Sequence, residues 1–242
     1  MILGRVGGGK TTHVHNLIED FVKDGFSDIV LIVPEQFSFA TERAMLSRLG
    51  PSEADKVEVL SFTRLADSVF RRYGGKNKRQ ISTGGRAILM SLALESVRDK
   101  LELYGKQVDR PALINEMLSI SSEFKQCAVS YEKLYETAQS INDCLLGKKM
   151  KDISLVLSAY NALTQQSNID DGDTLDDLYA SLSNNKYFKN KIVVIDGFRG
   201  FTQQELNIIE RILSQSMVTY ITLCMDTLYP LSEDAGVFTH VK

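Results

Sequence analysis

Residues 4–11 read "GRVGGGKT" and match the phosphate-binding loop pattern G-x-x-x-x-G-K-[ST] at every fixed position. In such a loop the glycines let successive backbone N–H groups curl around phosphates, because no Cβ atom stands in the way. The lysine places an ammonium on the outer phosphates, the next hydroxyl can ligate Mg²⁺, and the following helix directs its positive N-terminal end at the anion. The stretch therefore predicts a site for ATP and Mg²⁺. The expected nucleotide-binding residues are Gly4, Gly7, Gly8, Gly9, Lys10, Thr11 and Thr12.

The sequence on either side of the loop predicts an α/β fold. Residues 1–3 are typical of the end of a strand, and apolar residues recur at helical spacing over residues 14–22. "DIVLIVP" (28–34) and "KVEVLSF" (56–62) are apolar, β-branched runs that suit strands buried on both faces, and each precedes a helical pattern. This βαβαβα order indicates a parallel sheet flanked by helices.

The middle and the end of the chain differ in pattern. Residues 81–190 show helical periodicity without a convincing strand, which favours a helical insertion. The α/β pattern then returns with "KIVVIDGF" (191–198) and "MVTYITLCMD" (217–226), separated by a helix that begins with a capping box of Thr202 and Glu205. We therefore expect a nucleotide-binding domain of residues 1–80 and 191–242, and a helical subdomain of residues 81–190.

The run "IVVID" ends in Asp196, where a buried strand would present an acid to the metal. We expect Asp196 and Thr11 to hold Mg²⁺ through the nucleotide; the alternative is an aspartate that only begins the turn at Gly197. ATPase motors usually place a glutamate directly after this aspartate to orient the attacking water. Gly197 has no acid, amide or hydroxyl. We therefore expect nucleotide binding without efficient hydrolysis, and we assign no catalytic residue.

The composition is that of an ordinary globular protein, with 43% hydrophobic and 24% charged residues among 242. The net charge of −3 excludes a uniformly basic nucleic-acid-binding surface, so any such contact has to be local. The sequence contains no C-x-x-C pair, so it does not predict a metal or iron–sulfur site. We expect Cys127 and Cys224 to be small core residues. Without a membrane-spanning run or a signal peptide, we expect a cytoplasmic protein with no membrane partner.

Three further stretches indicate the class of phosphate-loop protein. "VPEQFSFATERAM" (33–45) follows the second strand, "VLSFTRLADSVFRRYGG" (59–75) follows the third, and "VVIDGFRGFTQQELNIIERIL" (193–213) contains the strand with the acid. In this order, with a helical insertion before the acid, they resemble the first motor domain of a UvrD-type superfamily-one DNA helicase. The motifs closely resemble the AddB/RexB family over nearly the whole chain, although the helical insertion matches only in pattern. The resemblance implies a RecA-like sheet.

Members of that family are B subunits of the bacterial ATP-dependent helicase–deoxyribonuclease that processes double-strand breaks. The resemblance implies a DNA-repair and recombination role, an A subunit as partner, and an N-terminal fragment of a longer protein. Its iron–sulfur cluster and nuclease are expected only in the missing C-terminal region. In this family the A subunit unwinds DNA, and the B subunit reads the passing 3′ strand for the Chi sequence. "CMDTLYP" (224–230) agrees, because it has no glutamine where working helicases sense the γ-phosphate.

The resemblance also implies contacts with single-stranded DNA. They fall on Gln36, Ser38, Phe62, Arg64, Phe198 and Phe201. Amide and hydroxyl groups can bond bases or phosphates, phenylalanine can stack on a base, and arginine can do either. Three structural alternatives stay open: Gln36 caps a helix, Phe62 fills the edge of the sheet, and Arg64 pairs with a local acid.

Two other functions stay open at this point. An active helicase motor needs a water-orienting acid, which Gly197 does not supply, and an arginine finger from a second motor domain. A small-molecule kinase is built on the same loop but is compact, and a helical insertion of roughly 100 residues does not fit it.

Overall fold

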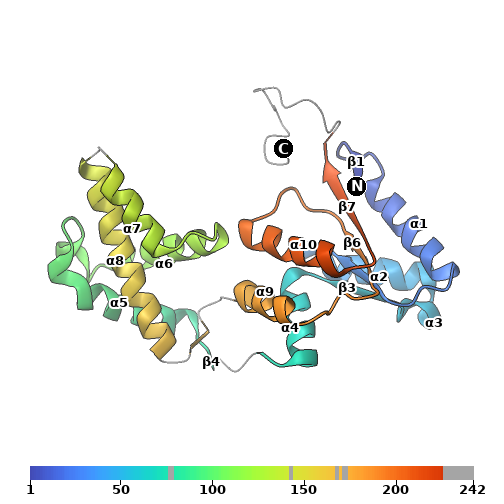
Figure 1. Ribbon diagram of the computed structural model, residues 1–242, viewed down its shortest axis with the longest axis horizontal. Coiled ribbons are helices and arrows are strands. Elements are labelled where there is room, and N and C mark those ends of the chain that lie inside the picture. The colour runs from blue at the N-terminus through green and yellow to red at the C-terminus, as the bar shows by residue number, and fades with distance from the viewer. Residues whose placement is uncertain (76–78, 142–143, 167–168, 171–173, 226–242) are drawn as a thin grey trace. The chain divides into compact units, whose positions relative to one another are not determined.

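The computed structural model describes residues 1–75, 79–141, 144–166, 169–170 and 174–225. The chain forms two compact units, and we describe each by itself. The first consists of Met1–Gly75 and Thr174–Lys242, and the second of Lys76–Asp173. Figure 1 shows a sheet with packed helices in the first unit and a group of helices in the second.

A five-stranded parallel sheet forms the centre of the first unit, in the order β1-β7-β6-β2-β3. The strands are β1 (Ile2–Gly4), β2 (Ile29–Ile32), β3 (Val57–Leu60), β6 (Ile192–Ile195) and β7 (Val218–Cys224). Strands β2 and β6 are buried on both faces, as their continuous apolar runs predict. The strand before the phosphate loop is separated from the acid-bearing strand β6 by β7 alone.

Helices cover both faces of this sheet (Figure 1). Val14 and Ile18 of α1 (Lys10–Lys23) and Met45 of α2 (Glu35–Leu49) pack on one face. The other face packs against α4 (Phe62–Tyr73), α9 (Thr174–Asn184) and α10 (Gln203–Gln215). A short helix, α3 (Pro51–Ala54), precedes β3. The α/β class predicted from the sequence, with helices on both faces of a parallel sheet, is confirmed.

Helix α9 differs from the expected domain boundaries. The sequence pattern places residues 174–184 in the helical insertion, whereas Leu178 and Leu182 are fully buried in the core of the first unit. Helical periodicity shows which face of a helix is apolar, but it does not show which core buries that face. The observed boundaries therefore lie near residues 75 and 174, where the sequence pattern predicts 80 and 190.

The second unit is a helical bundle with a core of its own. Its elements are β4 (Arg79–Gln80), α5 (Thr83–Val97), η1 (Arg98–Lys100), η2 (Gly105–Gln107), α6 (Pro111–Gln126), α7 (Tyr131–Ser140), α8 (Cys144–Gln166) and β5 (Ile169–Asp170). Within residues 81–190, where the sequence pattern shows no convincing strand, the structure has only the two-residue strand β5 among the described residues, and it pairs in parallel with β4, which lies just before that range. Cys127, expected in the core, is exposed because it directly follows the last turn of α6.

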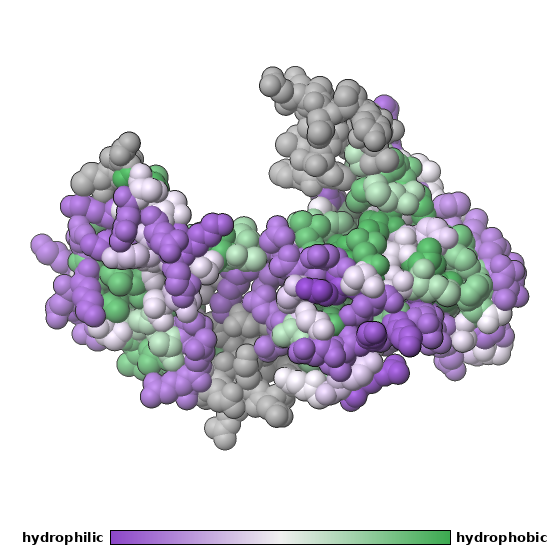
Figure 2. Space-filling view, viewed as in Figure 1, coloured by the Kyte–Doolittle hydropathy of each residue, from purple (hydrophilic) through white to green (hydrophobic). Residues whose placement is uncertain are grey.

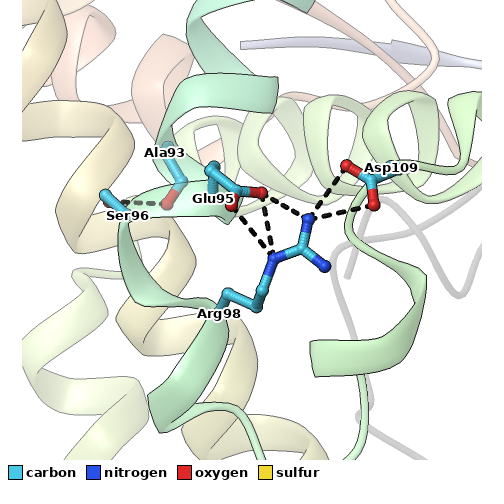
Figure 3. Close-up of polar contacts among 5 residues, drawn as sticks. All are labelled: Ala93, Glu95, Ser96, Arg98 and Asp109. Carbon is cyan, nitrogen blue, oxygen red and sulfur yellow. Dashed lines mark hydrogen bonds and ion pairs between the residues drawn. The ribbon is translucent and has the colours of Figure 1, made fainter.

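Polar contacts tie the loop between α5 and α6 to the bundle. Arg98 bonds the carboxylates of Glu95 and Asp109 with its guanidinium, so it bridges the end of α5 and the approach to α6 (Figure 3). These contacts raise the pKa of Arg98 above its already high value. The side chain of Asp152 in α8 is fully buried and accepts the backbone N–H groups of residues 102–104.

Apolar side chains remain exposed in the first unit. Figure 2 shows hydrophobic residues over α10 and along β7, and Leu206, Leu213 and Met217 are each about half exposed. The residues of β7 are mostly half-buried, unlike those of β2 and β6. Within the described part of the chain, no helix has the length and apolar character needed to cross a membrane.

Candidate nucleotide site and adjoining cleft

The loop between β1 and α1 has the backbone that its glycines predict. Gly7 and Gly9 have φ angles of 76° and 79°, in the left-handed region that L-amino acids with a Cβ disfavour. A Cβ at Gly8 would lie 3.0 Å from the carbonyl oxygen of Arg5, and one at Gly4 would lie 3.2 Å from Cγ of Lys10. At these four positions the loop therefore favours residues without a side chain, as expected of a backbone that closes around phosphates.

Helix α1 begins directly after the loop with its N-terminal end open. Gly9 is the N-cap and supplies no side-chain hydrogen bond, and the first turn of this fully described segment contains no acidic residue. The first N–H groups of a helix have no intrahelical acceptor, and the helix dipole makes that end positive. Thr11 and Thr12 are exposed there. The arrangement can hold an anion, with a hydroxyl beside it for a metal.

Lys10 folds back over the loop. Its Nζ donates to the carbonyl oxygens of Gly4, at 2.7 Å, and Arg5, at 2.9 Å. These two bonds hold the ammonium at the mouth of the loop, where a phosphate oxygen can be added as a further acceptor, since a lysine has three donors.

Asp196 follows β6, and its side chain is only 4% exposed. Its backbone N–H donates to the carbonyl oxygen of Ile32, and its carboxylate accepts a 2.6 Å hydrogen bond from Oγ1 of Thr222. Thr222 lies on β7 and pairs with Ile2 of β1, so it stands between the acid strand and the loop strand. The carboxyl ends of these parallel strands share one edge of the sheet, which places Asp196 on the same edge as the loop.

His15 adds an electrostatic feature on α1. Burial lowers the pKa of its imidazole, and the charge of Arg48 lowers that pKa further, while Asp196 acts in the opposite direction. No described residue hydrogen-bonds its buried Nε2. Among the described residues no three His, Cys, Asp or Glu side chains gather closely enough to hold a metal on their own.

Gly197 has a φ angle of 83°, and a Cβ at this position would meet Cδ of Pro34 at 3.4 Å. A left-handed backbone costs an L-residue roughly 1–2 kcal/mol. The position after the acid is therefore one at which the backbone itself disfavours glutamate.

A cleft of about 590 Å³ lies next to Gly197, at the carboxyl ends of β2, β3 and β6. Three helices, α2, α4 and α10, begin around it. Its lining residues are Val33, Pro34, Glu35, Gln36, Phe37, Ser61, Phe62, Thr63, Gly197, Phe198, Arg199, Gly200 and Glu205. The lining combines aromatic rings, an amide, hydroxyls and an arginine, which can bind an extended chain of bases and phosphates.

Three of the expected DNA-contact residues line this cleft: Gln36, Phe62 and Phe198. Gln36 is exposed, and the N-cap of α2 is Pro34, with no side-chain cap from Gln36. The ring of Phe198 packs edge-on against Phe62, with centroids 5.5 Å apart. Phe62 is only 5% exposed and belongs to the core of the first unit. It therefore has the packing role that the structural alternative describes, and it also lines the cleft.

The other three lie beside the cleft. Ser38 is buried, and its hydroxyl donates to the carbonyl oxygen of Glu35, so it faces its own helix. The ring of Phe201 packs obliquely on Phe198, with centroids 5.0 Å apart. Arg64 pairs with Glu42, the acid partner that the structural alternative required. For Ser38 the geometry gives no support to a DNA contact.

Several lining or supporting residues were missed from the sequence: Phe37, Thr63, Arg199, Glu42 and Thr222. The first three are neighbours of quoted motif positions and could have been included with them. Thr222 and Glu42 gave no sequence signal, because their roles depend on the strand order and on the packing of α2 against the start of α4. Of the "CMDTLYP" stretch (224–230), the structure describes Cys224 and Met225, and residues 226–230 lie outside the described residues.

Comparison with known proteins shows the family of this chain. The family model described as "ADDB, N-terminal" matches residues 1–242. This chain belongs to the AddB family. It is 37% identical over 249 aligned positions to the B subunit of the ATP-dependent helicase/deoxyribonuclease of Clostridium kluyveri (strain NBRC 12016). It is 32% identical over 242 residues to the B subunit of the same enzyme from Thermoanaerobacter sp. (strain X514).

In both comparisons all of this chain is covered, but only 21% of the relative. The chain therefore spans about a fifth of the length of the AddB relatives that it matches. The resemblance seen in the sequence motifs is confirmed at the level of the family.

Proposed function

We propose that this chain is the ATP-binding and single-stranded-DNA-reading region of the B subunit of a helicase–deoxyribonuclease for double-strand break repair, acting with an A subunit. The observation that supports it best is the arrangement at one sheet edge: an open phosphate loop, a buried aspartate followed by a left-handed glycine, and an aromatic cleft beside them. Membership of the AddB family supports the assignment to this complex.

The residues present fit a magnesium nucleotide. The glycine backbone of the loop and the open end of α1 provide N–H donors for the β- and γ-phosphates, and Lys10 adds a positive charge. Thr11 and Asp196 would hold the metal, Asp196 through water because it is buried and already bonded to Thr222. When bound, Mg²⁺ neutralises phosphate charge; the chain's own groups bind and orient the nucleotide.

Efficient hydrolysis is not part of this proposal. A working site needs a group that orients the attacking water, and the position after Asp196 is a glycine in a left-handed conformation. We expect the purified chain to bind ATP at a Kd that titration with a fluorescent nucleotide can measure, and to show negligible phosphate release with or without DNA. Rapid turnover by the purified chain would contradict the proposal and favour an active helicase motor.

Gly197→Glu tests whether the lost acid alone explains the missing hydrolysis. We expect no restored turnover, because the φ of 83° strains any L-residue at this position. The variant should also be about 1–2 kcal/mol less stable in urea denaturation. Gly197→Ala is the control, with the same backbone cost but no acid. Phosphate release by the glutamate variant alone would show that the site is an intact motor lacking one group.

Phe37→Ala tests the DNA cleft. Phe37 lines the cleft with half of its side chain exposed, so its removal leaves the core in place. Loss of a base-stacking ring costs about 1–3 kcal/mol, which predicts a roughly 5- to 150-fold weaker Kd for oligo-dT. Phe39→Ala is the matched control, since Phe39 is on the same helix and 76% exposed but does not line the cleft. Equal effects of both variants in fluorescence anisotropy would argue against the cleft.

A further inference from the structure

An ion pair occupies one of the expected DNA-contact positions. Nη1 of Arg64 lies 3.1 Å from Oε2 of Glu42, which joins the first turn of α4 to the middle of α2. Arg64 directly follows Thr63 of the cleft lining, and its backbone N–H donates to Oγ of Ser61, the N-cap of α4. The start of α4 is therefore fixed, while the guanidinium is held by Glu42.

The ion pair between Arg64 and Glu42 is exposed enough to be broken by a competing ligand. The side chains of Arg64 and Glu42 are 40% and 54% exposed, and exposed pairs of this kind contribute little to stability. The contact is made by one nitrogen, and no other hydrogen bond from this guanidinium to a described residue is observed. An arginine has five N–H donors, so Arg64 keeps further donors for a ligand at the edge of the cleft.

The other charged residues near the cleft are arranged differently. Glu205 lines the cleft, but its carboxylate accepts the N–H and hydroxyl of Thr202 in a capping box, as the sequence predicted. Arg199 lies in the lining and is exposed. Glu35 also lies in the lining and is exposed, so the lining carries acids as well as Arg199. Glu42 neutralises the neighbouring Arg64.

We propose that Glu42 is a counter-charge that masks Arg64 and is displaced when a DNA phosphate enters the cleft. This inference rests on the proposed DNA-reading function. A phosphate that replaces Glu42 at Arg64 gains one contact, but the carboxylate stays nearby and repels it. Glu42 therefore lowers the affinity of Arg64 for a DNA phosphate, which suits a strand that has to pass through the cleft and be released.

Glu42→Gln tests the proposal on the full 242-residue chain, with oligo-dT as the probe and anisotropy as the measurement. Removing the carboxylate charge while keeping the shape should tighten binding roughly 3- to 10-fold at low salt. Arg64 meets the phosphate with or without Glu42, so it is the loss of this contact in Arg64→Gln that should flatten the plot of log K against log salt, by about 0.7. Arg64→Gln should weaken binding, and Glu42→Gln should have no effect in that background.

Glu53→Gln is the matched control for net charge. Glu53 is a comparably exposed acid paired with Lys56, and it lies before β3, at the opposite end of the sheet from the cleft. An equal gain from Glu53→Gln, or a gain from Glu42→Gln that persists without Arg64, overturns the masking role. If Arg64→Gln weakens binding but Glu42→Gln does not tighten it, the inference fails and the DNA-reading function stands. If wild-type chain binds no oligo-dT at low salt, both fail.

Discussion

Lys10→Ala is expected to weaken ATP binding by about 2–3 kcal/mol, or roughly 30- to 150-fold in Kd, because a charge-assisted hydrogen bond to phosphate is lost. The ammonium is held at the loop mouth by the carbonyl oxygens of Gly4 and Arg5, so it is already positioned for the outer phosphates. The loss should therefore grow with the number of phosphates. AMP, which does not reach the lysine, should bind the variant and the wild type alike.

Lys23→Ala is the control for this measurement. Lys23 is on the same helix and pairs with Glu19 on the surface at its other end, so its removal changes the net charge equally without touching the loop. Titration calorimetry with ATP, ADP and AMP separates the two variants. If Lys10→Ala lowered the affinity for all three nucleotides equally, the loop would have collapsed and the effect would not report a missing phosphate contact. If its ATP affinity were unchanged, the proposed nucleotide site would be wrong.

Sequence reasoning succeeded where the conformation of a residue depends on its immediate neighbours. Positive φ at Gly7 and Gly9, the capping box at Thr202 and the buried strand ending in Asp196 all follow from local chemistry. A parallel sheet buried between two helical layers produces long apolar runs, and these are visible in one dimension. The α/β class was predicted correctly for that reason.

It failed where partners are far apart in the chain. Thr222 reaches Asp196 only because β7 lies between β1 and β6, a strand order that local pattern does not encode. Helical geometry turns the hydroxyl of Ser38 to the carbonyl of Glu35, a contact that the sequence pattern does not predict, and its expected contact with DNA stays a prediction. Helix α9 has the apolar periodicity of the insertion but packs in the other core. In each case the three-dimensional packing determines which partner or core a residue contacts, and the local sequence pattern is the same for either outcome.

Asp152→Ala is expected to destabilise the helical unit by about 3–5 kcal/mol, a large share of the stability of a typical domain. The carboxylate is fully buried on α8 and accepts three backbone N–H groups, those of Glu102, Leu103 and Tyr104, at 2.8–3.1 Å. Alanine leaves all three donors without their acceptor. Hydrogen exchange at these amides should accelerate most, and the urea midpoint of the bundle should fall.

Asp109→Ala removes an acid that lies in the loop itself, and so separates the loss of the buried acceptor from the general loss of a negative charge. Asp109 is 79% exposed and bonds Arg98, which Glu95 also holds, so its removal should leave the urea midpoint within error (Figure 3). Asp152→Asn should lie between the two, because its amide keeps one acceptor but turns an NH₂ group toward the N–H donors. ATP binding should survive in all three variants, since the loop belongs to the other unit. If Asp152→Ala were as stable as Asp109→Ala, the backbone of residues 102–104 would have to find other acceptors, and the buried carboxylate would not hold this loop to the bundle.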